Sequence, residues 1–368
     1  MFIRSALLLC ALFFSLFNTA VIADSRDYWL IDEFVRNHPE QAAIGAAFAR
    51  QVRDTANPLQ QPLKQPIKIS VIYPGEQVSD YWRRSISSFE ARMQELNIPY
   101  QMDSVYTKPA VELREQAKHI LKAMSKDTDY LIFTLDARRH QNIIERIINA
   151  GKPKLILQNI TTPIKAWNDN QPFLYVGFDH VEGTKLLANW YNQARPDMKD
   201  YALMYWAKGY ISEARGDSFI EFMKQGADPK LVSAYYTDAS RKNAFENASR
   251  ILADTTQLDL IYACSTDVAL GVSDAIQAYG QQGKILVNGW GGGSAELAAL
   301  KKGQLDVTVM RMNDDNGVAM AEAIKLDVQG KSTSVPTIYS GDFAVITKDT
   351  PAAEIEQFKQ RAFRYSGI

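Results

Sequence analysis

The stretch IKISVIYPGEQVSDYW, residues Ile67 to Trp82, joins a short apolar run to the polar start of a helix. Similar runs recur along the chain, and most of them end in a polar or aromatic residue. Strands that are apolar throughout are typical of parallel sheets, which are buried on both faces. Ligands bind such sheets outside the carboxyl ends of the strands, so the pattern predicts α/β domains with a small-molecule site. Further examples are YLIFTLD (130–136), LILQN (155–159), IYACSTD (261–267), ILVNGWGGG (285–293) and VTVMR (307–311).

The helix expected after the first strand shows its buried face in the sequence. Its apolar residues recur at steps of three and four, which places them on one stripe of a helix. They are Trp82, Ile86, Phe89, Met93 and Leu96. Ser79 or Asp80 would cap the N-terminus of this helix.

The strand and helix units form two series, which predicts two Rossmann-like lobes joined by three hinge crossings. The predicted segments are a signal peptide (1–23), an N-terminal extension with two helices and a proline-punctuated linker (24–66), an N-terminal lobe (67–177 plus 292–337) and a C-terminal lobe (178–291 plus 338–368). The hinge candidates are the glycines near Gly177, Gly291 to Gly293 and Gly341. Two such lobes form a clamshell that closes on a ligand.

The N-terminus is typical of a secretory signal. Arg4 supplies the positive charge, an apolar segment follows it, and small residues precede Asp24. We therefore predict a periplasmic protein with no direct membrane insertion after cleavage. The alternative is an N-terminal membrane anchor, although the apolar segment is short for a helix that spans a bilayer.

Charge and cysteine content exclude several classes of protein. The chain has 41 basic and 42 acidic residues, so it offers no electrostatic footprint for nucleic acid or anionic membranes. Cys10 lies in the predicted signal, which leaves Cys264 alone in an apolar run. A small buried side chain is the expected role of Cys264, and a catalytic thiol is the alternative. The histidines are scattered without ligand spacing, so we predict no metal site and no cofactor. They are His38, His119, His140 and His180.

Long motifs along the chain resemble one group of ribose/galactose-type periplasmic binding proteins. The segments are YPGEQVSDYW, LIFTLD, LILQNITTP, YVGFDH, GYISEARGD, IYACSTDVALG, NGWGGGSAEL and VTVMRMNDD. They resemble the LuxP-like proteins over essentially the whole mature chain. The resemblance implies the type I periplasmic binding protein clamshell and a non-enzymatic function. It also implies binding of the quorum-sensing signal autoinducer-2, as a furanosyl borate diester, and signalling through the periplasmic domain of a LuxQ-type hybrid sensor kinase.

The same resemblance implies which residues contact the ligand. They are Gln77, Ser79 and Trp82 after the first strand, Asn159 in LILQN, Arg215 in EARGD, Ser265 and Thr266 in CSTD, Trp290 in NGWGGG, and Arg311 in VTVMR.

Two of these residues suit an anion on chemical grounds alone. Arg215 and Arg311 would supply charge and fixed donor forks to a borate diester. Strand order would place Arg311 in the N-terminal lobe and Arg215 in the C-terminal lobe, so that one anion would bridge the lobes. The alternatives are ion pairs with neighbouring carboxylates, namely Glu213 or Asp217 for Arg215, and Asp314 or Asp315 for Arg311.

The aromatic and neutral candidates each have a second interpretation. Trp82 and Trp290 could stack on a furanose-sized ring, or they could belong to the core. Gln77, Ser79, Asn159 and Thr266 offer donors and acceptors for hydroxyls, but Ser79 and Thr266 could instead cap helices. Asp136 and Asp267 are weaker candidates, because a carboxylate would repel an anionic ligand.

Three other classes of function are alternatives to a signal receptor. A sugar-binding protein of an ABC transporter would share the fold and the compartment. A repressor of the same fold would need a DNA-reading helix pair where the signal peptide stands. A Rossmann-like enzyme would need an acid–base constellation, and no such arrangement can be argued from the sequence.

Overall fold

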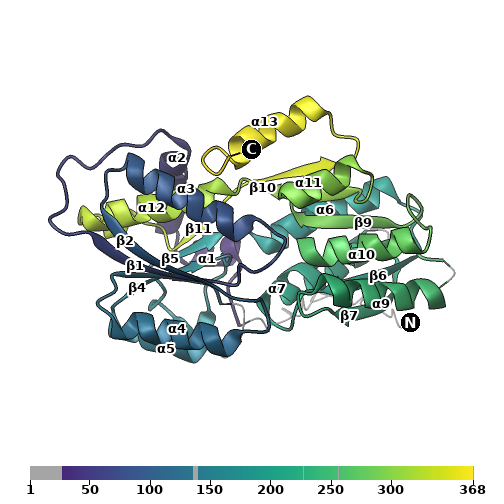
Figure 1. Cartoon of the computed structure of the whole chain (residues 1–368), viewed down its shortest axis with the longest axis horizontal. Helices are drawn as coiled ribbons and strands as arrows, with labels where there is room; N and C mark the ends of the chain where they lie inside the picture. The colour runs from purple at the N-terminus through teal and green to yellow at the C-terminus, as the bar shows by residue number, and fades with distance from the viewer. Residues whose placement is uncertain (1–26, 136–139, 227, 256, 368) are drawn as a thin grey trace, which may run out of the picture.

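The protein consists of two lobes, each built on one sheet with helices on both faces (Figure 1). The computed structural model describes residues 27–135, 140–226, 228–255 and 257–367. The predicted signal peptide therefore lies outside the described residues. No helix within the described ranges combines the length and apolarity needed to cross a membrane.

The first sheet has the strand order β11-β5-β4-β3-β1-β2, and all its pairs are parallel. Its strands are β1 (Ile67–Tyr73), β2 (Tyr100–Tyr106), β3 (Tyr130–Phe133), β4 (Lys154–Gln158), β5 (Leu174–Gly177) and β11 (Ile338–Ser340). The helices α3 (Tyr81–Glu95) and α12 (Asp314–Val328) cover one face, and α4 (Leu113–Ser125) and α5 (Gln141–Ala150) cover the other (Figure 1). The apolar stripe of α3 is buried as predicted, with Phe89, Met93 and Leu96 fully enclosed.

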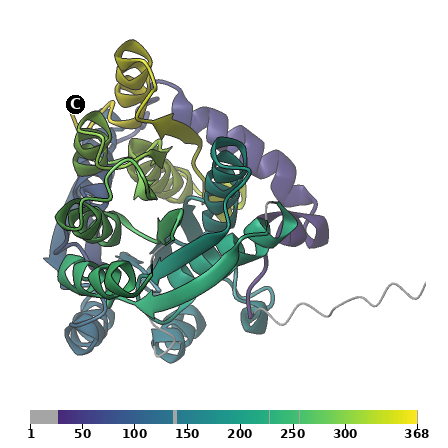
Figure 2. The same ribbon diagram turned by 90° about the vertical axis from the view of Figure 1, so that its right-hand side faces the viewer.

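The second sheet has the order β12-β10-β9-β8-β6-β7 and is parallel except for β12. Its strands are β6 (Asp200–Tyr205), β7 (Lys230–Tyr236), β8 (Leu260–Ala263), β9 (Leu286–Gly291), β10 (Val307–Arg311) and β12 (Phe343–Thr347). Its helices are α6 (His180–Ala194), α7 (Tyr210–Ser212), α8 (Ser218–Gln225), α9 (Arg241–Asp254), α10 (Thr266–Ala278), α11 (Ser294–Lys301) and α13 (Ala352–Ala362). The green helices α9 to α11 lie on one side of this sheet and the teal α6 on the other (Figure 2).

The chain crosses between the sheets three times, as predicted, but two of the predicted boundaries are wrong. The strand β10, expected in the N-terminal lobe, pairs with β9 in the second sheet. The strand β11, expected in the C-terminal lobe, pairs with β5 in the first sheet. The crossings therefore follow Gly177, Arg311 and Ser340. The first and third lie side by side, because the Gly341 amide donates to the Gly177 carbonyl at 2.8 Å. The second lies beside the third, because the Met312 amide donates to the Asp342 carbonyl at 3.0 Å.

The glycines of the NGWGGG motif serve a turn and not a hinge. Gly291 and Gly292 adopt φ values of 139° and 66°, which side chains other than glycine rarely adopt. A Cβ atom on Gly292 would lie 2.4 Å from the Cα of Met310. Glycine is needed here because the turn from β9 to α11 passes against β10 within one lobe.

The N-terminal extension packs on the N-terminal lobe. Its two predicted helices are α1 (Ile31–Asn37) and α2 (Glu40–Arg53). Phe48 and Val52 of α2 are fully buried in the core of that lobe, next to Tyr339 of β11. The extension thereby completes the hydrophobic core beside the third crossing.

Candidate ligand-binding site

One cavity between the lobes gathers all nine residues predicted to contact a ligand. It encloses about 490 Å³ of space not filled by protein atoms, part of which is open to solvent. Its lining includes Gln77, Ser79, Trp82, Asn159, Arg215, Ser265, Thr266, Trp290 and Arg311. Five residues outside the predicted set also line it, namely Pro74, Tyr81, Thr134, Trp206 and Ile211.

The cavity lies where the strands of both sheets end. Asn159 directly follows β4, Ser265 follows β8 after one residue, and Arg311 is the last residue of β10. Thr134 and Trp206, which the residue-level prediction missed, directly follow β3 and β6. The rule that ligands bind outside the carboxyl ends of strands would have found both.

Arg215 lies on a π-helical turn (Glu213–Asp217) between α7 and α8. Single π-helical turns often occur at functional sites. Arg215 is 4% exposed, and its Nη1 donates to the Cys264 carbonyl at 2.7 Å. The predicted alternative partner Asp217 instead accepts a hydrogen bond from the Tyr205 hydroxyl at 2.5 Å. Burial, together with the positive charge of Arg311, lowers the pKa of Arg215 to about 9.

Arg311 lies at the second crossing and not in the predicted N-terminal lobe. Its guanidinium carbon is 4.1 Å from the centre of the Tyr81 ring, a cation–π distance. Its Nε has no hydrogen-bond partner within the described part of the chain. The alternative partners are engaged elsewhere, since Asp314 accepts two backbone N–H groups and Asp315 lies 3.0 Å from Arg364. Burial lowers the pKa of Arg311.

Two buried positive charges thus share one cavity, and neither makes an ion pair with a carboxylate of the described residues, although the charges of Glu296 and Asp80 partly offset that of Arg311. Such charges are costly unless a counter-charge reaches them. A ligand that brings negative charge or several acceptor oxygens would supply that partner.

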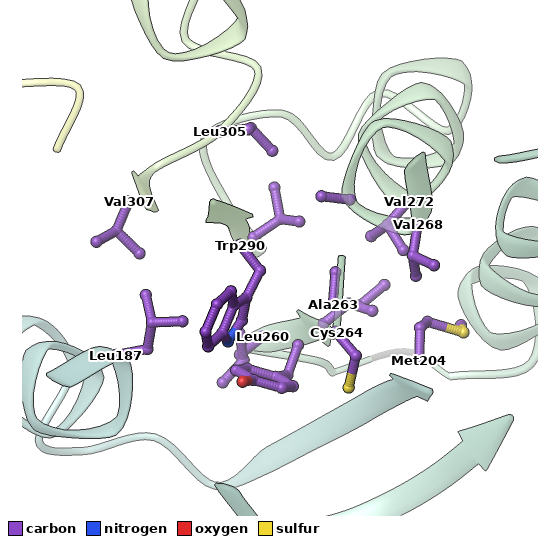
Figure 3. Packing of buried hydrophobic residues seen from close by; sticks show 14 of the residues in the cluster. Leu187, Met204, Leu260, Ala263, Cys264, Val268, Val272, Trp290, Leu305 and Val307 are labelled. Atoms are coloured by element: carbon purple, nitrogen blue, oxygen red, sulfur yellow. The ribbon is translucent and has the colours of Figure 1, made fainter. Parts of the chain in front are cut away.

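Trp290 belongs to the core of the C-terminal lobe as well as to the cavity. Its side chain lies in the hydrophobic cluster that also contains Leu187 and Cys264 (Figure 3). The guanidinium of Arg215 lies 3.6 Å from its ring centre, so this ring face already has a partner. Trp290 therefore packs against the guanidinium of Arg215. A ligand ring would have to stack on another part of the cavity lining. Trp82 also serves both roles, because its ring centre lies 4.6 Å from that of Tyr73 in the core of the other lobe.

The neutral residues leave hydrogen-bonding atoms unused. Asn159 Oδ1 and Ser265 Oγ are buried and have no partner in the described ranges. The expected helix caps are met only in part, since Asp80 does occupy the N-cap of α3. The side chain of Asp80, at the N-cap of α3, makes no capping hydrogen bond, and α10 begins at Thr266 with Ser265 before it. The hydroxyls of Ser79 and Thr266 are therefore not used as caps in this structure.

Hydrogen bonds at the rim join the two lobes directly. The carboxylate of Asp267 on α10 accepts from the Val78 amide at 3.1 Å and from the Ser79 amide at 3.4 Å. The carboxylate of Asp80 accepts from the Ser294 amide at 3.2 Å and from its hydroxyl at 2.9 Å. Asp267 therefore contacts the opposite lobe and not the ligand space. Asp136, the other weaker candidate, lies outside the described residues.

Cys264 takes the expected structural role. It is a free, fully buried thiol in the core of the C-terminal lobe. Burial raises its pKa well above the usual range, which keeps the thiol protonated and unreactive.

Comparison with known proteins identifies the family. A family model described as a periplasmic binding protein domain matches residues 69–332. The chain belongs to the periplasmic binding protein family. Membership implies a periplasmic location and agrees with the prediction that this binding protein is not an enzyme.

The relatives of this binding protein are distant. The D-allose-binding periplasmic protein of Escherichia coli K12 is 27% identical over 134 residues, which is 36% of the chain and only 43% of the length of that relative. The D-allose-bound solute-binding protein of an ABC transporter from Actinobacillus succinogenes 130z has 19% identity and a TM-score of 0.68. That alignment covers 80% of this chain and all of the other. The fructose-binding periplasmic domain of a hybrid two-component system has 17% identity, coverage of 80% and 95%, and a TM-score of 0.70. The two structural similarities show a shared fold.

Proposed function

We propose that this periplasmic binding protein is a receptor that closes its lobes on one small, sugar-like, negatively charged molecule. The observation that carries the proposal is the pair of buried guanidinium groups, Arg215 and Arg311, in the cavity between the lobes. A neutral sugar would leave both charges without compensation, whereas an anion would pair with them.

Autoinducer-2, as a furanosyl borate diester, is the ligand that we propose. It combines a furanose-sized ring with one negative charge and several acceptor oxygens, and the LuxP-like motifs support it independently of the cavity. The unpartnered Ser265 hydroxyl could donate to a ligand oxygen, and Asn159 Oδ1 could accept from a ligand hydroxyl. The cavity is within the size range of small-molecule sites.

Signalling through the periplasmic domain of a LuxQ-type hybrid sensor kinase completes the proposal. Ligand binding would shift the equilibrium between open and closed lobes and so change the surface that the kinase contacts. The likeness to a periplasmic domain of a hybrid two-component system is compatible with this partner at the level of the fold.

The second candidate is the sugar-binding protein of an ABC transporter. The comparisons support this candidate better than they support signalling, because the named relative binds D-allose and one similar structure is an ABC transporter protein with D-allose bound. In this case the arginines would donate to ring hydroxyls, and the partner would be a permease.

Analysis of the naturally bound ligand separates the candidates. The full chain is expressed in hosts with and without autoinducer-2 synthesis and then denatured, and the released molecule is analysed by boron NMR and a signal-reporter assay. A boron-containing, reporter-active ligand from the producing host alone is the expected result. A plain sugar released from both hosts would establish the transport function instead. Capture of the purified periplasmic domain of the kinase, with a permease as the control, tests the partner.

A further inference from the structure

His180 links the two lobes directly behind the cavity. It is the first residue of α6, next to the first crossing, and it is 1% exposed. Its Nε2 lies 3.0 Å from the backbone oxygen of Asn159 in the N-terminal lobe. Its Nδ1 lies 3.4 Å from Nε and 3.3 Å from Nη2 of Arg215 in the C-terminal lobe. One imidazole therefore contacts two residues that line the cavity, but it is not part of the lining itself.

The partners determine where the imidazole proton lies. A carbonyl oxygen only accepts hydrogen bonds, so Nε2 carries the hydrogen toward Asn159. A guanidinium only donates, so Nδ1 must present its lone pair to Arg215. A second proton on Nδ1 would face the positive charge of Arg215. Burial and this charge lower the pKa of His180 well below its usual value, which agrees with a neutral ring.

The same contacts determine which donors Arg215 has left. Two of its five N–H groups point to Nδ1 of His180, and one on Nη1 points to the Cys264 carbonyl. One N–H on each terminal nitrogen remains for a ligand. On the other side, the Asn159 amide donates to the Val176 carbonyl at 2.8 Å, so both backbone groups of Asn159 are engaged. Its side chain is left to line the cavity.

We propose that His180, as the neutral tautomer with its proton on Nε2, is a positioning residue that holds Arg215 and Asn159 in ligand-binding geometry. It acts without touching the ligand. The contacts of His180 involve protein groups alone, so the assignment rests on the proposed function only for the identity of the ligand.

Two substitutions separate positioning from packing. His180→Phe keeps a ring beside Trp290 and Tyr210, whose ring centres lie 5.2 and 5.7 Å away, but it removes both hydrogen bonds. His180→Gln keeps one donor and one acceptor. With autoinducer-2 in borate buffer as the probe, we expect His180→Phe to lose about 10- to 100-fold in affinity, the order of one buried hydrogen bond to a charged group. We expect His180→Gln to stay within a few-fold of the wild type. Equal affinity of His180→Phe and the wild type, or an equal loss in both variants, would overturn the proposal.

A measurement without ligand keeps this test independent of the proposed function. In the ¹⁵N-labelled full chain, the imidazole of His180 should show a protonated Nε2 and a bare Nδ1 from pH 5 to 8. The Arg215 Nε–H resonance should shift in His180→Phe and remain near its place in His180→Gln. A protonated Nδ1, or an Arg215 resonance that ignores His180→Phe, would contradict the positioning role. If the wild type bound no autoinducer-2 but these resonances behaved as expected, only the proposed ligand would be wrong.

Discussion

Replacing Arg311 with methionine should change ligand affinity and ligand-free stability in opposite directions. Arg311 is 5% exposed, and its Nε has no hydrogen-bond partner in the described structure. Arg311→Met keeps an unbranched apolar stem of similar reach and removes the charge. Tyr81, at 4.1 Å, would lose a cation–π contact but would keep an apolar neighbour.

The expected gain in stability follows from the cost of burying a charge. Replacing buried ionic groups with well-packed apolar side chains is often neutral, or stabilises by about 1–4 kcal/mol. The lost cation–π contact offsets about 0.5–2 kcal/mol of this gain. We therefore expect the free energy of unfolding of the closed, ligand-free form to rise by about 1–2 kcal/mol, and by less where the lobes open and Arg311 reaches water.

The expected loss in affinity follows from the charge pair with the ligand. Truncating one partner of a buried, hydrogen-bonded charge pair costs about 2–5 kcal/mol. At about 1.4 kcal/mol for each factor of ten, the affinity for an anionic ligand should fall by roughly 30-fold to several thousand-fold. Arg311→Lys keeps the charge but loses the planar fork, so its affinity should fall between those of the two other proteins.

Calorimetric titration with autoinducer-2 in borate and denaturant unfolding of the ligand-free protein measure the two effects. Arg92→Met is the matched control, because Arg92 is equally buried but lies 2.6 Å from Glu322. Removing this paired charge should destabilise the protein by about 3–5 kcal/mol and should leave the cavity intact. Both substitutions remove a buried guanidinium. The difference between their changes in unfolding free energy therefore reports the effect of a carboxylate ion-pair partner, which Arg92 has and Arg311 lacks.

One pattern of results would refute this reasoning. If ligand-free Arg311→Met unfolded at a lower denaturant concentration than the wild type, as Arg92→Met should, the charge of Arg311 would stabilise the fold through a partner within the protein. If it also bound the ligand with unchanged affinity, Arg311 would not be a ligand contact at all.

Two further predictions concern the contact between the lobes and the pH dependence of stability. Asp267→Ala removes the acceptor of the Val78 and Ser79 amides and should weaken ligand binding by about tenfold through faster dissociation, as stopped-flow release would show; unchanged dissociation would contradict a role in closure. Burial, only partly offset by Arg364, raises the pKa of Asp315 to about 6. Because this pKa is raised in the folded protein, the contribution of Asp315 to stability is fully present below pH 4 and is lost as the pH rises through 6. The free energy of unfolding of Asp315→Asn should therefore come to exceed that of the wild type by up to about 3 kcal/mol as the pH rises from 4 to 7. Parallel stability curves in denaturant titrations would contradict this assignment.

The strands and the α3 stripe could be predicted because they depend on local patterns. A short, mainly apolar run such as VTVMR indicates a buried strand wherever it lies in the fold. It does not indicate which sheet the strand joins, and β10 was therefore placed in the wrong lobe. That choice depends on the pairing with β9 and β12, and the residues of the run itself do not encode this pairing. The second crossing, at Arg311 to Asp314, contains neither glycine nor proline and so had no local signal.

The lining of the candidate cavity was predictable where residue type and strand end coincide, and less so where a contact joins segments that are distant in the sequence. All nine predicted residues line the cavity, whereas His180 lacks metal-ligand spacing and offers no such signal in the sequence. Its one local signal was its place after Asp179, whose carboxylate caps α6 by accepting from the Val181 amide at 2.9 Å. The link to Arg215 joins segments 35 residues apart, so no pattern in the sequence could reveal it.

The corrected position of Arg311 also changes how the ligand would drive closure. The sequence suggested that one anion bridges an arginine from each lobe. In the structure, both guanidinium groups project from the side of the second sheet, so opening the lobes would not separate them. Opening would instead expose Arg311 to water, because Tyr81 and Phe178 of the N-terminal lobe cover it at 4.1 and 5.8 Å. Closure therefore costs the desolvation of Arg311 beside a second positive charge, and a negatively charged ligand offsets that cost only in the closed state. This differential interaction is the property that a ligand needs to shift a conformational equilibrium.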